Sequence, residues 1–140
     1  RNYAERLGVP LAIIEKRRAS NDPTTKALTL IGDVEDHDVI IFDEEISTGS
    51  TIESAVKICK KNGAREIVVL FIHAVLSPNA PERLASLPVR EFVTTDTVPI
   101  PPEKKAKFGE RLKVVTVAPL LGEVIRRANQ GRSVGELFNE

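Results

Sequence analysis

Three consecutive acidic residues, Asp43, Glu44 and Glu45, end an apolar run and stand just before a short segment of small polar residues, Ser47–Thr51. Carboxylates in this position can hold sugar hydroxyls or a divalent cation. The small segment offers backbone amides, four hydroxyls and one glycine, Gly49. Amides at the start of a helix carry partial positive charge and bind phosphate well. The two features together predict a site for a phosphorylated sugar.

The same segment has a purely structural interpretation. Ser50 or Thr51 could cap the following helix, which stabilises a helix by about 1 kcal/mol. Three adjacent carboxylates repel one another, however, and a sugar diol or a hydrated Mg²⁺ ion would relieve that repulsion. The phosphate-binding patterns GxGxxG and GxxxxGK[ST] are both absent from the sequence, which excludes those two classes of nucleotide-binding loop.

The elements around these residues alternate between strand and helix. Apolar runs at 39–42, 66–73, 91–94 and 113–117 predict strands, and residues 52–61, 79–87 and 119–129 have helical patterns between or after them. This alternation predicts an α/β fold with a central, mostly parallel sheet and helices on both faces. Residues 99–107 are interpreted as a linker within the domain. Ligands of such sheets bind at the carboxyl ends of the strands.

Basic residues follow another predicted strand, at 11–14. Lys16, Arg17 and Arg18 come directly after it and before a polar stretch that we interpret as a mobile loop. Lys16 and Arg18 could neutralise phosphate charge, although a solvated basic turn is the simpler interpretation. His73, at another strand end, fits a hydrogen-bonded histidine at the rim of the core better than a catalyst.

Composition narrows the function classes. The chain has 140 residues, 41% of them hydrophobic, which suits one domain with a real core. Its 20 basic and 20 acidic residues give no net charge, so there is no broad attraction to nucleic acid or to an anionic membrane. No apolar run approaches the roughly 20 residues of a membrane helix, and we expect a cytoplasmic protein. The single cysteine, Cys59, is expected to be a buried core residue.

The stretch DEEISTGST, residues 43–51, resembles the phosphoribosyl diphosphate (PRPP) motif of the type I phosphoribosyltransferase fold. Further segments narrow the resemblance to the ribose-phosphate pyrophosphokinases, also called PRPP synthetases. These segments follow one another in the family's order over nearly the whole chain; they are LAIIEKRR (11–18), TLIGDVE (29–35), HAVLSPN (73–79), FVTTDTVP (92–99) and VAPLLGEVIRR (117–127).

The resemblance implies a phosphoribosyltransferase-like domain over residues 1–140 that forms the C-terminal half of a longer, two-domain enzyme. Such an enzyme transfers a diphosphoryl group from Mg-ATP to ribose 5-phosphate and releases PRPP and AMP. Homo-oligomers are expected, and no nucleic acid or membrane partner.

The resemblance also implies roles for particular residues. Lys16 and Arg18 would be catalytic, and Asp43 and Glu44 would bind the magnesium ion. The residues implied to bind ribose 5-phosphate are Asp43, Glu44, Ser47, Thr48, Gly49, Ser50 and Thr51.

The stretch departs from the family motif at three positions. Glu44 stands where the family usually has Asp, Ser47 stands where the motif has an acid, and Ser50 stands where it has a glycine. Two alternatives therefore stay open: a phosphoribosyltransferase that consumes PRPP, and a non-catalytic regulatory subunit associated with a PRPP synthetase. The family's ATP-binding segments are not in this sequence, so we expect the chain alone to bind ribose 5-phosphate without turnover.

Overall fold

The strands and helices follow the alternation that the sequence predicts. The computed structural model describes residues 2–18 and 26–138, and it does not describe the side chains of residues 2 and 16–28. The strands are β1 (Ile13–Arg18), β2 (Lys26–Ile31), β3 (Val39–Glu45), β4 (Ile67–His73), β5 (Glu91–Thr95) and β6 (Leu112–Val115). The helices are α1 (Asn2–Leu7), α2 (Ser50–Lys61), α3 (Ala80–Ala85), α4 (Pro102–Phe108) and α5 (Ala118–Asn129), with short 3₁₀ turns η1 (Gly109–Arg111) and η2 (Gly135–Leu137).

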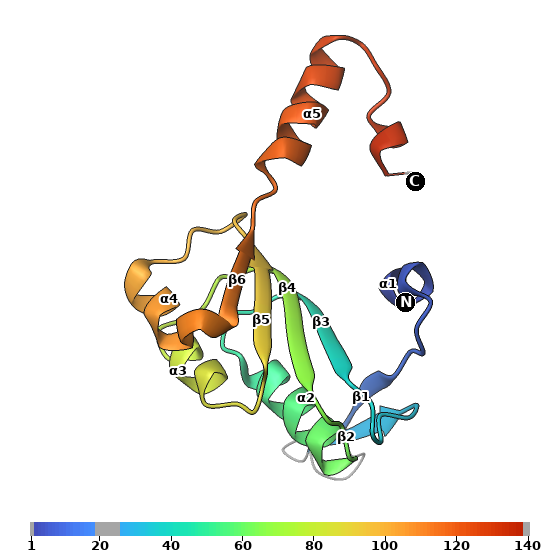
Figure 1. Cartoon of the computed structure of the whole chain (residues 1–140), viewed down its shortest axis with the longest axis vertical. Coiled ribbons are helices and arrows are strands. Elements are labelled where there is room, and N and C mark those ends of the chain that lie inside the picture. The colour runs from blue at the N-terminus through green and yellow to red at the C-terminus, as the bar shows by residue number, and fades with distance from the viewer. Residues whose placement is uncertain (1, 19–25, 139–140) are drawn as a thin grey trace.

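Four strands form one parallel sheet in the order β3-β4-β5-β6 (Figure 1). Strands β1 and β2 make a separate antiparallel ribbon. Parallel neighbours need a crossover connection, and α2, α3 and α4 supply it between successive strands. The predicted α/β fold with a parallel sheet flanked by helices is confirmed.

One face of the sheet carries the core. Side chains alternate along β4, so Ile67, Val69 and Phe71 are buried together on this face. Helices α2, α3 and α4 contribute buried residues to the same cluster, among them Val56 and Leu84. Burial of this cluster is what holds the helices to the sheet.

The opposite face is more open. Ile40 and Phe42 point to it from β3, and 54% and 37% of their surfaces are exposed. Helix α1 approaches this face, because the ring of Tyr3 lies 4.2 Å from that of Phe42 between centroids. Helix α5 has no buried residue and extends away from the sheet beyond the end of β6 (Figure 1).

The segment interpreted as a linker contains most of helix α4, so that prediction is wrong for 102–107. Helix α4 begins at Pro102, a position that proline tolerates well, and it ends at the buried Phe108. The ring of Phe108 packs edge-on against Phe92, with centroids 5.2 Å apart. The prolines stand at or before the first turn of α4, where they do not interrupt the helix, and the apolar anchor lies at its other end.

The basic residues lie within a strand instead of following one. β1 continues through Arg18, and Lys16 and Arg18 pair with residues of β2. The polar stretch after them, 19–25, falls outside the described residues. The expected mobile loop therefore stays a prediction.

Cys59 lies in the core, as the sequence predicts, and burial raises the pKa of its thiol. Within the described ranges, none of the helices has the length and apolarity that crossing a membrane requires.

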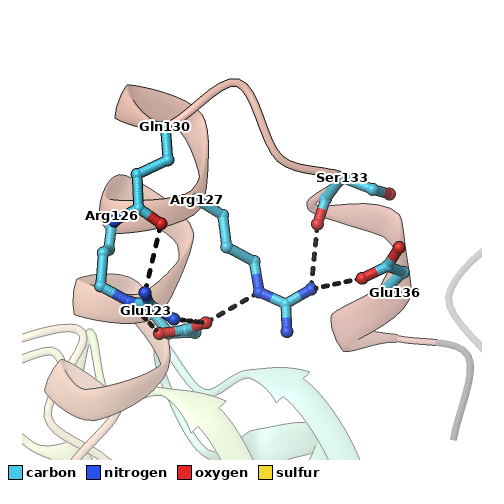
Figure 2. A network of polar contacts seen from close by, with 6 residues as sticks. All are labelled: Glu123, Arg126, Arg127, Gln130, Ser133 and Glu136. Carbon is cyan, nitrogen blue, oxygen red and sulfur yellow. Dashed lines mark hydrogen bonds and ion pairs between the residues drawn. The ribbon is translucent and has the colours of Figure 1, made fainter.

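A network of charged side chains joins α5 to the C-terminal turn (Figure 2). Glu123 accepts hydrogen bonds from Arg126 at 2.7 Å and 2.8 Å and from Arg127 at 2.8 Å. Arg127 also donates to Glu136 and to the carbonyl of Ser133, each at 3.0 Å. Arg127 thus links the middle of α5 to the turn that contains η2.

This network gives a pH prediction. The Arg126 and Arg127 hydrogen bonds hold the pKa of Glu123 at about 2, below its ordinary value of 4.5. The ionised Glu123 carboxylate therefore stabilises the folded state fully above pH 4.5, and this stabilisation is lost as the pH falls toward 2. An NMR titration of the Glu123 carboxyl carbon should show a midpoint near 2, and a midpoint near 4.5 would contradict the network.

Glu123→Gln should speed amide exchange around η2 at neutral pH more than Glu136→Gln does.

Candidate functional site

A hollow of about 150 Å³ lies where β3 turns into α2. Its lining combines two carboxylates with the small polar loop: Asp43, Glu45, Ile46, Ser47, Thr48, Gly49, Thr51 and Ile52. The position is the carboxyl end of a parallel strand, where ligands of such sheets bind. Most of the residues predicted to bind ribose 5-phosphate are therefore brought together.

The loop leaves its amides available. Gly49 is the N-cap residue of α2, in the left-handed region with φ 75°, and no side chain caps the helix. The hydroxyls of Thr48 and Ser50 contact each other at 3.0 Å instead. The purely structural interpretation of Ser50 and Thr51 as capping residues is therefore wrong. The first amides of α2 have no partner within the helix and can bind an anion. The Ser50 amide makes only a long contact of 3.5 Å to the Thr48 hydroxyl.

Gly49 is the residue type that this turn needs. Its φ of 75° is one that other residues rarely adopt. A Cβ atom built on it would also lie 3.1 Å from two carbon atoms of the Leu84 side chain. Helix α3 therefore packs directly against the loop, and a larger residue at this position would displace one of them.

The carboxylates divide between the two faces of β3. Asp43 and Glu45 are two positions apart and line the hollow, whereas Glu44 does not. The amide of Glu44 donates to the Asp43 side chain at 2.9 Å. Alternation of side chains along a strand places Glu45 on the face of Asp43, while the predicted role of Glu44 stays a prediction. Ser50 is also absent from the lining.

The donor set fits a magnesium ion only in part. The described residues include no cluster of three or more His, Cys, Asp or Glu side chains able to hold a metal. Magnesium usually binds one or two carboxylates and completes its shell with water and substrate phosphates. Asp43 with one neighbouring carboxylate meets that requirement if the ligand supplies phosphate oxygens.

Arg83 is a site residue that the sequence reasoning missed. Its Nη1 donates to the carbonyl of Thr48 at 2.9 Å, and its Nε lies 3.4 Å from the Glu53 carboxylate. It comes from α3, 35 positions further along the chain, and nothing in the local sequence pattern indicates the contact. His73, in turn, contacts Thr97 through Nδ1 at 2.9 Å, as expected of a rim histidine.

The comparison with protein families agrees with the resemblance that the loop residues indicate. Residues 10–139 match the model of the phosphoribosyl synthetase-associated domain. The chain belongs to this family. The chain is also similar to the ribose-phosphate pyrophosphokinases from Caldanaerobacter subterraneus subsp. tengcongensis, 43% identical over 138 residues, and from Nostoc sp., 40% identical over 139 residues.

The relatives are longer than this domain. Each match covers 99% of the chain but only 42% and 41% of these two proteins. The crystal structure of phosphoribosylpyrophosphate synthetase from Mycobacterium smegmatis is similar to 93% of the chain and 40% of its own, with a TM-score of 0.82 and 37% identity. The family domain and its fold are thus shown. The predicted C-terminal position within a longer enzyme is not confirmed.

The tight contact between Gly49 and Leu84 makes a stability prediction. Gly49→Ala should lower the free energy of unfolding by about 1–2 kcal/mol for the left-handed backbone, and further because Leu84 must move. The matched control is Gly131→Ala, since Gly131 has a similar φ of 65° and open space around it. Urea unfolding should show a larger loss for Gly49→Ala. Equal losses would mean that the packing of α3 against the loop has no energetic role.

Proposed function

We propose that this domain binds the ribose 5-phosphate unit in an enzyme that makes PRPP. The observation that carries the proposal is the loop after β3, where Gly49 and uncapped helix amides lie beside the carboxylates of Asp43 and Glu45. A phosphorylated sugar has both kinds of group that this arrangement recognises. Its phosphate accepts hydrogen bonds and its hydroxyls donate them.

The loop Ser47–Thr51 takes the 5-phosphate in this proposal. The available donors are backbone amides, with hydroxyl groups from Thr48 and Thr51 at the same hollow. Such donors need no net positive charge, because the aligned peptides of α2 supply a partial one. Asp43 accepts hydrogen bonds from the ribose hydroxyls. A second carboxylate would bind the ribose hydroxyls together with Asp43. The resemblance to the motif indicates Glu44 for this role, and the lining of the hollow indicates Glu45.

The reaction belongs to a longer protein, as in the relatives named ribose-phosphate pyrophosphokinase. We propose transfer of a diphosphoryl group from Mg-ATP to the anomeric hydroxyl of ribose 5-phosphate, with release of AMP. The magnesium ion would bind near Asp43 and neutralise phosphate charge. Lys16 and Arg18 would stabilise the charge that spreads over the transferred group, which is the main requirement of phosphoryl transfer.

Two observations favour a regulatory subunit as the second candidate. Ser47 and Ser50 replace an acid and a glycine of the motif. A subunit of this kind would bind ribose 5-phosphate or PRPP and would not support turnover in its parent protein. Lys16→Ala in the parent protein separates the two, because an unchanged rate would exclude a catalytic role for Lys16.

Calorimetry on the 140-residue chain tests the binding. We expect ribose 5-phosphate to bind and unphosphorylated ribose not to bind measurably, because the loop amides need a phosphate to accept their hydrogen bonds. We expect no AMP from ATP and ribose 5-phosphate with this chain alone. Absence of ribose 5-phosphate binding by the folded chain would overturn the proposal, and AMP formation would refute the expected lack of turnover.

Substitutions that remove the negative charge and keep the shape of the side chain test the carboxylates. Asp43→Asn and Glu45→Gln should each weaken ribose 5-phosphate binding by about tenfold, the effect of losing a hydrogen bond to a charged group. Glu44→Gln is the matched control on the same strand and should bind within about twofold of the unmodified chain, since Glu44 does not line the hollow. If Glu44→Gln weakens ribose 5-phosphate binding more than Glu45→Gln does, Glu44 and not Glu45 is the carboxylate that acts with Asp43.

A further inference from the structure

Three successive carbonyl groups of the loop are held by donors from outside it. The amides of Leu76 and Ser77 donate to the carbonyls of Ile46 and Ser47, each at 2.9 Å. Arg83 Nη1 donates to the next carbonyl, that of Thr48, also at 2.9 Å. The backbone of the loop is therefore tied, residue by residue, to the segments after β4.

These bonds determine where the loop amides point. In a trans peptide the carbonyl and the following N–H face in opposite directions. With the carbonyls of Ile46, Ser47 and Thr48 bonded to their donors, the following amides face away from those donors. In the part of the chain that is described, the amides of Ser47, Thr48 and Gly49 donate no backbone hydrogen bond. They are left for a ligand.

The first two donors come from a buried turn. Leu76 is 1% exposed and has a φ of 42°, which is unusual for a residue with a branched side chain. Its carbonyl accepts a hydrogen bond from the Lys104 ammonium group of α4. The turn is thus held on both sides, and its two donors are main-chain groups that do not depend on the side chain present.

Arg83 supplies the third donor, and it is a side chain. Its guanidinium group also reaches Glu53, on the first turn of α2, with 3.4 Å between Nε and the carboxylate. It therefore connects α3, the loop and α2 at once. A guanidinium group can make both contacts in a fixed geometry, whereas a lysine ammonium group acts as a single point charge.

We propose that Arg83 is a positioning residue for phosphate binding: it fixes the peptide between Thr48 and Gly49 so that the Gly49 amide faces the ligand. This inference rests on the proposed function for the identity of the ligand. The geometry of the peptide itself does not depend on it. Arg83 acts through the main chain, and no contact between Arg83 and the phosphate is required.

The test compares Arg83→Met and Arg83→Lys with Lys107→Met. Lys107 is the matched control, because its 3.2 Å ion pair joins α4 to Glu82 on α3, the helix of Arg83, and does not involve the loop. Calorimetry with ribose 5-phosphate should show affinity about tenfold weaker for Arg83→Met, as expected for losing a charged hydrogen bond. Arg83→Lys should recover part of the affinity, and Lys107→Met should bind like the unmodified chain.

A second measurement needs no ligand. Amide exchange and ¹⁵N relaxation of residues 47–49 in the free chain should show greater mobility in Arg83→Met and no change in Lys107→Met. Unchanged loop dynamics in a folded Arg83→Met chain would overturn the inference. So would unchanged ribose 5-phosphate affinity.

The two measurements separate this inference from the proposed function. If the unmodified chain binds no ribose 5-phosphate, the proposed function fails, and the dynamics of the loop still decide the role of Arg83.

If Arg83→Met does not fold, Glu53→Gln takes its place, because it removes one of the two anchors of the guanidinium group and leaves Arg83 intact. It should increase the mobility of the loop by a smaller amount, and an unchanged loop would again overturn the inference.

Discussion

The turn from β3 into α2 favours a glycine at its tightest point, and much of the structure is arranged around that constraint. Gly49 has a left-handed conformation, and an added Cβ atom would lie only 3.1 Å from the Leu84 side chain of α3. The close approach of α3 brings Arg83 within reach of the Thr48 carbonyl. The same turn begins α2 without a capping side chain, which leaves amides for a ligand. One backbone conformation thus couples the packing of a helix to the chemistry of the loop.

Two of the three donors that support the loop are uncharged main-chain amides, those of Leu76 and Ser77. The turn at Leu76 is buried and adopts an unusual conformation, and such residues persist only where the surrounding structure holds them. Here the hydrogen bond to the Ile46 carbonyl and the one from Lys104 hold it. A rigid support of this kind suits phosphate binding, because amides that already face the ligand need no reordering when it binds.

The sheet is covered unequally. Helices α2, α3 and α4 bury one face, while Ile40 and Phe42 on the other remain partly exposed and helix α5 extends away from the sheet (Figure 1). The ion network centred on Glu123 and Arg127 organises α5 and the turn after it without help from the core (Figure 2). Helices α2 and α3, which contact the loop after β3, both pack on the buried face.

The sequence by itself determined the parallel α/β fold, the order of its strands along the chain and the place of the polar loop after β3, because these follow from local patterns. Apolar runs mark the strands, and DEEISTGST is contiguous. The sequence predicted a linker where α4 forms, because the packing of Phe108 against Phe92 on β5 is a tertiary contact that local patterns do not indicate. It paired Asp43 with Glu44, although alternation along β3 turns Glu45 toward the hollow. Only the tertiary structure brought Arg83 to Thr48 and Leu84 to Gly49, because those contacts join residues about 35 positions apart across separately packed elements.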